Sequence, residues 1–72
     1  MKIVVPVDPD IVNSKLVALN IDNQPVMDFK GEVYGSSEKK LVLEVGGLYG
    51  RGMHVMELLT EKGVYKRYAF SL

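Results

Sequence analysis

The residues best suited to bind a ligand or a metal surround His54, the only histidine in the chain. His54 follows a glycine-rich stretch, residues 46–52, in which four of the seven positions are glycine. Such a stretch exposes backbone N–H groups, and at the start of a helix these groups can bind an anion with the help of the helix dipole. An imidazole beside that stretch can also ligate a metal ion or a metal cluster. The candidate ligand-binding residues are Tyr49, Gly50, Arg51, Gly52 and His54, with His54 as the candidate metal ligand.

The same residues have a plainer structural explanation. A single histidine in a chain without cysteine is a poor set of metal ligands. The glycine spacing is neither that of a dinucleotide-binding turn nor that of a P-loop. Residues 46–52 then serve as a flexible connection, and His54 is a partly exposed helix residue. The sequence does not identify a cofactor.

A second group of candidates lies near the C-terminal end, where basic and aromatic residues alternate. These side chains could contact a protein partner, or stack on bases and touch phosphates. The candidate interaction residues are Tyr65, Lys66, Arg67 and Tyr68. The alternative is an edge strand whose charges limit aggregation while its aromatic rings pack inward. Nine basic residues balance nine acidic ones, so nucleic acid is not the favoured partner.

No catalytic constellation is recognisable, and we expect no enzyme. The serine and threonine residues lack an accompanying histidine–carboxylate pair. Asp8 and Asp10 flank a turn, and two carboxylates on a turn do not make an acid–base site.

The size of the chain points to one domain, residues 1–72, with a small core. Without cysteine it has no disulfide, so a homodimer or a protein partner is the expected source of further stability. No apolar run is long enough to cross a membrane. Residues 1–8 do not read as a signal peptide, and the expected location is the cytoplasm.

Residues 3–7, 15–21, 26–34, 39–45 and 64–72 read as strands, with the second to fourth forming a meander joined by turns at residues 22–25 and 35–37. The first run is apolar throughout and predicts a strand buried on both faces. Gly52, Val55, Met56 and Leu59 recur at helical spacing, and Gly63 suits a helix C-cap. The expected fold is therefore α+β or α/β, a mixed sheet of four or five strands with one packed helix. The alternative is an all-β small barrel in which residues 53–70 form a hairpin through Glu61, Lys62 and Gly63.

Two segments resemble the dinitrogenase iron–molybdenum cofactor-binding family. Residues 1–8 (MKIVVPVD) resemble its opening strand, and residues 50–64 (GRGMHVMELLTEKGV) resemble its glycine-led helix and the strand entry after it. The resemblance implies an α/β domain of the ribonuclease H-like kind that binds or carries an iron–sulfur or iron–molybdenum cluster precursor.

Two functional hypotheses follow. The first is a small domain that binds a metal cluster or an anionic ligand through the glycine-rich stretch and His54. The second is an interaction module that binds a protein or a nucleic acid through its last strand, as a monomer or as a homodimer.

Overall fold

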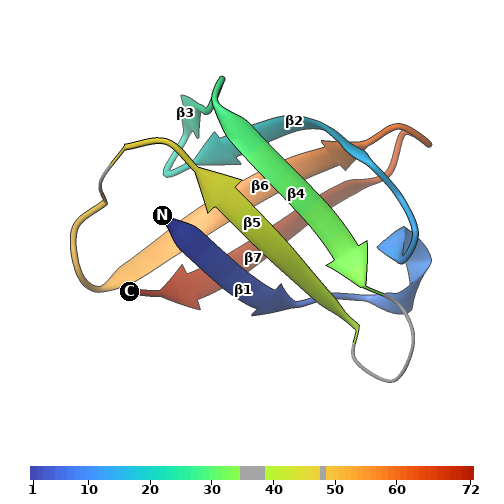
Figure 1. Cartoon of the computed structure of the whole chain (residues 1–72), viewed down its shortest axis with the longest axis horizontal. Coiled ribbons are helices and arrows are strands. Elements are labelled where there is room, and N and C mark those ends of the chain that lie inside the picture. The colour runs from blue at the N-terminus through green and yellow to red at the C-terminus, as the bar shows by residue number, and fades with distance from the viewer. Residues whose placement is uncertain (35–38, 48) are drawn as a thin grey trace.

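The described residues form β-strands and one short 3-10 turn. The computed structural model describes residues 1–34, 39–47 and 49–72, and Figure 1 shows their arrangement. The elements in chain order are β1 (Lys2–Pro6), a 3-10 turn (Pro9–Ile11), β2 (Leu16–Ile21), β3 (Gln24–Pro25), β4 (Phe29–Tyr34), β5 (Lys40–Val45), β6 (Met53–Thr60) and β7 (Tyr65–Ser71).

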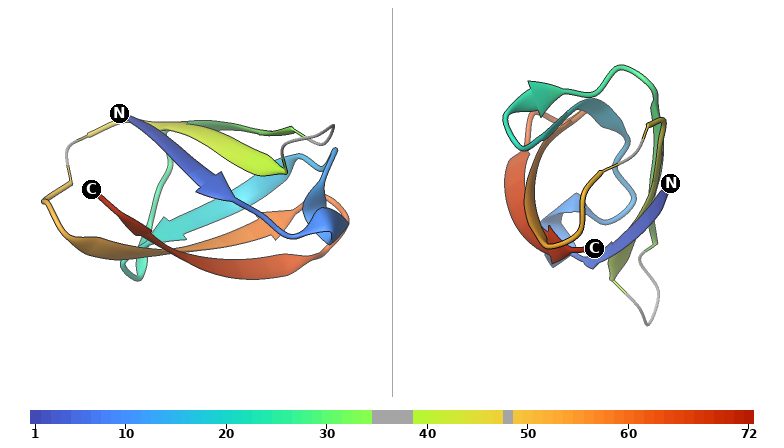
Figure 2. Two further views of the ribbon diagram at one scale, coloured as in Figure 1. Left: turned by 90° about the horizontal axis from the view of Figure 1, so that it is seen from below. Right: turned by 90° about the vertical axis from the view of Figure 1, so that its left-hand side faces the viewer.

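The strands form two antiparallel sheets. One has the order β1-β5-β4 and the other has the order β3-β2-β6-β7. The two sheets face each other and curl around a shared interior, which Figure 2 shows from the end of the molecule. This architecture matches the all-β alternative, including the hairpin of residues 53–70, since β6 and β7 pair from Met53–Ser71 to Leu59–Tyr65.

The expected packed helix is wrong, because residues 53–60 form strand β6. Its side chains alternate between the two faces: Leu58 is 1% exposed, whereas its neighbour Leu59 is 37% exposed. The helical spacing arose because β6 also carries apolar residues on its outer face. Gly63 has a φ of +81° and turns the hairpin instead of capping a helix.

Two further expectations about the sheet are corrected. The first strand is not buried on both faces, because Val4 is 52% exposed and only alternate residues of β1 point inward. The meander is limited to the β4–β5 hairpin, since β2 pairs with β3 and β6, and β5 also pairs with β1. There is no mixed sheet among the described residues, and the α/β fold implied by the resemblance is not formed there. The turn expected at residues 35–37 lies outside the described residues.

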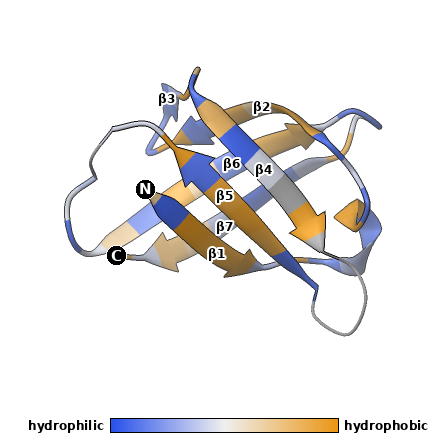
Figure 3. Ribbon diagram, viewed as in Figure 1, coloured by the Kyte–Doolittle hydropathy of each residue, from blue (hydrophilic) through white to orange (hydrophobic). Residues whose placement is uncertain are grey.

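The core lies between the sheets and draws on both of them. In Figure 3 hydrophobic colouring is continuous along the middle of β1 and β5, whereas β7 is mostly polar until its end. The buried hydrophobic residues are Ile3, Val5, Ile11, Leu19, Ile21, Val33, Leu41, Leu43, Val45, Met56, Leu58 and Phe70. Phe70 is therefore the contribution of β7 to the buried set, and it places the last strand against the core.

Candidate functional site

His54 lies on the inner face of β6 and is 9% exposed. Both of its ring nitrogens have oxygen partners. Nδ1 lies 2.5 Å from Oδ2 of Asp22, and Nε2 lies 2.6 Å from the main-chain carbonyl oxygen of Gly50. The ring thus joins the turn after β2 to the segment that precedes β6.

Asp22 owes its position to a two-residue hairpin turn. Ile21 pairs with Gln24, and the two residues between them, Asp22 and Asn23, both have positive φ, at 51° and 65°. This is the pattern of a type I′ turn, in which aspartate and asparagine are favoured. The Asp22 backbone N–H donates to the carbonyl oxygen of Val55 at 2.8 Å, and its Oδ1 accepts from the Val55 N–H at 3.0 Å. These bonds aim Oδ2 at the neighbouring ring.

The arrangement of acceptors around His54 favours its doubly protonated form. A carboxylate and a carbonyl oxygen only accept hydrogen bonds, so both ring nitrogens must carry a proton to satisfy them. The hydrogen bonds to Asp22 and to Gly50 accordingly raise the pKa of His54 above its ordinary value. The bond from His54 lowers the pKa of Asp22 in turn. When the imidazole is protonated, His54 and Asp22 form a charged pair that connects the β2–β3 turn to strand β6.

Two aromatic rings complete the surroundings of His54. The ring of Phe70, directly opposite on β7, stacks on the imidazole with a centroid distance of 5.5 Å and an interplanar angle of 25°. The ring of Tyr49 meets it edge-on at 6.1 Å. Of the five candidate ligand-binding residues, the structure thus gathers Tyr49, Gly50 and His54.

Gly52 and Arg51 contribute differently. Gly52 has a φ of +111° and exchanges two backbone hydrogen bonds with Leu72, each 3.0 Å long, so it extends the β6–β7 ladder. Arg51 is exposed. The stretch 46–52 leads into a strand, and the helix N-terminus on which the anion site depended is not formed.

A metal at His54 stays a prediction. Either ring nitrogen would have to give up its hydrogen bond and its proton before it could bind a metal. Within the described ranges, no group of three histidine, cysteine, aspartate or glutamate residues is placed to hold a metal ion.

The interaction candidates on β7 divide between two faces because the strand alternates. Tyr65 and Arg67 point outward and are exposed, and the Tyr65 hydroxyl donates to the carboxylate of Glu57. Lys66 and Tyr68 are half-buried on the other face. The four side chains therefore do not form one stacking surface.

Lys66 and Tyr68 are engaged by carboxylates from the segment after β1. Lys66 Nζ lies 3.2 Å from Asp8 Oδ2 and 2.8 Å from Asp10 Oδ2. The Tyr68 hydroxyl accepts from the Asp8 backbone N–H and donates to Asp8 Oδ2, both at 3.1 Å. We call these four residues the polar clamp, because they tie β7 to the chain that leaves β1.

Replacing Lys66 by methionine should lower the melting temperature at neutral pH, because the stem is kept while the charge partner of both carboxylates is lost. The hydrogen bonds from Lys66 and Tyr68 lower the pKa of Asp8 in the folded state. A carboxylate whose pKa is lowered by folding stabilises the folded state at a pH above its ordinary pKa. That stability is lost as the pH falls through the pKa of the folded state. Thermal melts of the parent and Lys66→Met should therefore converge in strong acid. Lys62→Met, at an exposed position in the β6–β7 turn, is the control, and an equal effect from it would contradict the clamp.

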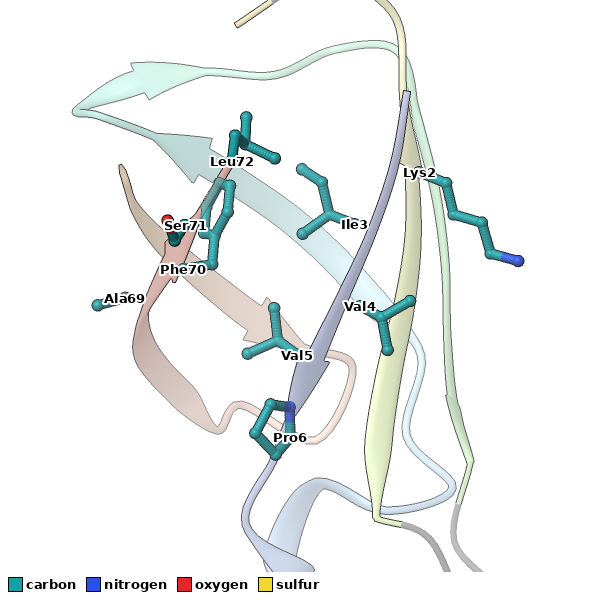
Figure 4. A pocket seen from close by; sticks show the side chains of 9 residues that line it. All are labelled: Lys2, Ile3, Val4, Val5, Pro6, Ala69, Phe70, Ser71 and Leu72. Atoms are coloured by element: carbon teal, nitrogen blue, oxygen red, sulfur yellow. The ribbon is translucent and has the colours of Figure 1, made fainter. Parts of the chain in front are cut away.

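β1 and β7 lie side by side without backbone hydrogen bonds, since they are the last strands of separate sheets. Residues Lys2–Pro6 and Ala69–Leu72 line a groove of about 320 Å³ between them, which we call the β1–β7 seam. In Figure 4, Ile3 and Val5 point from β1 toward Phe70, while Lys2 and Val4 point away. The seam thus has a buried apolar floor between two strand edges.

Sequence reasoning found His54 but missed Asp22. The available signal was the Asp22–Asn23 pair, which marks a tight turn. That a strand pairing brings this turn beside His54, 32 positions along the chain, could not be read from spacing.

The described part of the chain contains no helix with the length and apolar character needed to cross a bilayer. Compared with protein-family models, with curated proteins and with solved structures, the chain has no match in any of the three.

Proposed function

We propose that this chain is a non-enzymatic interaction module that adds an extended segment to the free edge of β7, and that this segment is β7 of a second copy. A strand edge can bind another strand through main-chain hydrogen bonds. The observation that carries the proposal is the row of outward-pointing backbone groups on β7.

These groups follow from the pairing of β7 with β6. Leu72 exchanges hydrogen bonds with Gly52, and the Thr60 N–H donates to the carbonyl oxygen of Val64. Opposed residues of an antiparallel pair alternate between bonded and non-bonded, so the even-numbered residues of β7 bond to β6. The backbone groups of the odd-numbered residues point into the β1–β7 seam and have no backbone partner within the described ranges: Tyr65, Arg67, Ala69 and Ser71.

The opposite edge of the seam is a poorer template. Met1 and Val45 exchange hydrogen bonds across the β1–β5 pair, so Lys2, Val4 and Pro6 present their backbone to the seam. Pro6 has no N–H to donate. At the seam, β7 therefore presents four residues with both a backbone N–H and a backbone C=O, and β1 presents two.

A second copy fits β7 without a charge conflict. In a two-fold antiparallel pair centred on Tyr68, Arg67 lies opposite Ala69 of the second copy, and Tyr65 lies opposite Ser71. Centring the pair on Arg67 would set two arginines against each other, which is unfavourable. The same edge serves both copies, as a two-fold interface requires. The core of a 72-residue chain without disulfides also gains stability from such a partner.

A nucleic acid is less well served by the same strand. Lys66 and Tyr68 are held by Asp8 and Asp10. That leaves Arg67 as the one cation among the four candidate interaction residues that is not held in the polar clamp.

Amide hydrogen exchange across the micromolar range tests the proposal on the unaltered protein. As the concentration rises, the amides of Tyr65, Arg67, Ala69 and Ser71 should gain protection. The even-numbered amides of β7 already bond to β6 and serve as the internal reference. Sedimentation equilibrium should show a dimer forming over the same range, and the melting temperature should rise with concentration. A monomer throughout, or protection that is equal for odd and even residues, would overturn it.

Ala69→Pro removes one free-edge donor from each copy and leaves the β6 ladder intact. Two hydrogen bonds are lost per dimer, so the dissociation constant should rise about tenfold or more. Ala69→Thr keeps the N–H and should dimerise like the parent. Circular dichroism at low concentration checks that both variants fold. Ser71→Pro, at the end of the same edge, supplies the result if Ala69→Pro is unfolded.

A further inference from the structure

The hydrogen bonds of His54 connect the protonation state of one side chain to the end of β7 that borders the seam. Nε2 holds the Gly50 carbonyl oxygen at 2.6 Å, and Gly52, two residues further on, is paired with Leu72 at the end of the β6–β7 ladder. Phe70, the residue that stacks on the imidazole, is also part of the floor of the seam. His54 thus contacts β7 directly and secures the segment to which β7 is bonded.

We propose that His54 is a proton-operated latch: as the imidazolium it fastens the segment Tyr49–Gly52 and keeps the end of β7 in strand conformation, and on losing a proton it releases both. This inference deepens the proposed function and rests on it where it concerns association. It assigns a regulator, the proton, to the same strand edge.

The release follows from the two acceptors. A neutral imidazole has one N–H, and the carboxylate of Asp22 is the stronger acceptor, so the remaining proton stays on Nδ1. The lone pair of Nε2 then faces the Gly50 carbonyl oxygen, and two acceptors at that distance repel each other. Gly50 must move away or recruit water, and the Gly52–Leu72 pair loses its support.

The groups that face the ring come from three elements. The β2–β3 turn supplies Asp22, the segment before β6 supplies the phenol of Tyr49 and the Gly50 carbonyl, and β7 supplies the uncharged ring of Phe70. Asp22 is the charged side chain in contact with the ring within the described part of the chain. Its negative charge favours the imidazolium, so the latch opens at a pH above the ordinary pKa of histidine.

The sign of the pH effect follows from that environment. The pKa of His54 is raised in the folded state above its ordinary value of 6.5. A histidine whose pKa is raised by folding stabilises the folded state fully at a pH below its ordinary pKa. That stability is lost as the pH rises through the pKa of the folded state. The end of β7 is therefore most ordered in mild acid. Because an ordered edge binds a strand at a lower entropic cost, association should weaken as the latch opens.

The latch is tested first on monomer, at high dilution or with Ala69→Pro. Nuclear magnetic resonance of the imidazole nitrogens should show both protonated in mild acid and a titration midpoint above the ordinary pKa of 6.5. Amide exchange at Gly52 and Leu72 should accelerate through that midpoint beyond the intrinsic rise with pH. The amide of Thr60, bonded to Val64 at the other end of the same hairpin, is the reference and should follow the intrinsic rise alone.

Three variants sharpen this result. Asp22→Asn keeps the shape of the acceptor and removes its charge, so the midpoint should fall toward the ordinary value. Asp10→Asn, in the polar clamp, should leave the midpoint unchanged. His54→Gln cannot titrate and should abolish the pH response of Gly52 and Leu72. A midpoint at or below the ordinary value, or a response of Gly52 and Leu72 that matches Thr60, would overturn the latch.

Association is then measured separately, as the dissociation constant of the parent against pH. A constant that rises several-fold through the His54 midpoint supports the coupling, and one that is flat overturns it. A parent that never dimerises contradicts the proposed function and this coupling, while the midpoint and exchange data still decide the latch. A failed latch, in turn, leaves dimerisation through β7 intact.

Discussion

Met56→Asp should unfold the protein. Met56 is fully buried at the centre of β6, between Ile21 on β2 and Tyr68 on β7. His54, two positions away on the same inner face of β6, is already paired with Asp22. A carboxylate at position 56 must therefore either stay charged in an apolar interior or take up a proton at neutral pH. We expect a loss of about 3 kcal/mol or more. That is comparable with the whole stability of a domain at the lower end of the usual range.

Met53→Asp is the matched control, because it is the same substitution three positions earlier on the same strand. Met53 is 69% exposed, and the change should stay within about 0.5 kcal/mol. Urea denaturation followed by circular dichroism measures both. In a helix, positions 53 and 56 would share a face, so similar losses in both variants would contradict strand β6.

Gly31→Val should also destabilise the fold, by about 1–3 kcal/mol, through overpacking. A Cβ on Gly31 would lie 2.8 Å from Leu16 Cδ1 and 3.2 Å from Leu43 Cδ1. Valine is a better strand former than glycine, so a net loss reports the clash and not backbone preference. Gly50→Val is the control, since a Cβ there meets nothing within 4 Å and the residue does not have a left-handed φ.

A double-mutant cycle identifies the side chain responsible. Leu16→Ala alone loses packing, and Gly31→Val alone adds crowding at the same place. If Leu16 fills the space above Gly31, the two changes together should cost less than the sum of the single changes. Strictly additive losses of stability, measured by urea denaturation, would show that the Leu16 side chain does not pack against Gly31.

The strands were largely predictable because their side chains alternate or are β-branched. Residues 15–21, 39–45 and 64–72 predict strands close to β2, β5 and β7. β6 was not, because Val55 and Leu59 on its outer face lie beside the inward-pointing Met56 and Leu58. A two-sided apolar strand of eight residues reproduces helical spacing, and only its pairing with β2 and β7 decides between the two.

Pairing between distant strands was the missing information elsewhere as well. Nothing local to residues 16–21 indicates that β2 lies against β6 and not against β4. The position of Asp22 beside His54 depends on that choice, and so does the polar clamp, in which Asp8 meets Tyr68 across 60 positions. Sequence patterns identified the histidine and the C-terminal strand as places of interest, but not their partners.

Asp22 carries two requirements that a protein engineer would want to separate. As the first central residue of a type I′ turn, its position is usually best served by asparagine followed by glycine. As the partner of His54, the same position needs a negative charge. Position 23, which also has a positive φ, carries no such second duty in the described contacts. Redesign of the turn for stability therefore has freedom at one position only, because improving the other would exchange responsiveness to protons for rigidity.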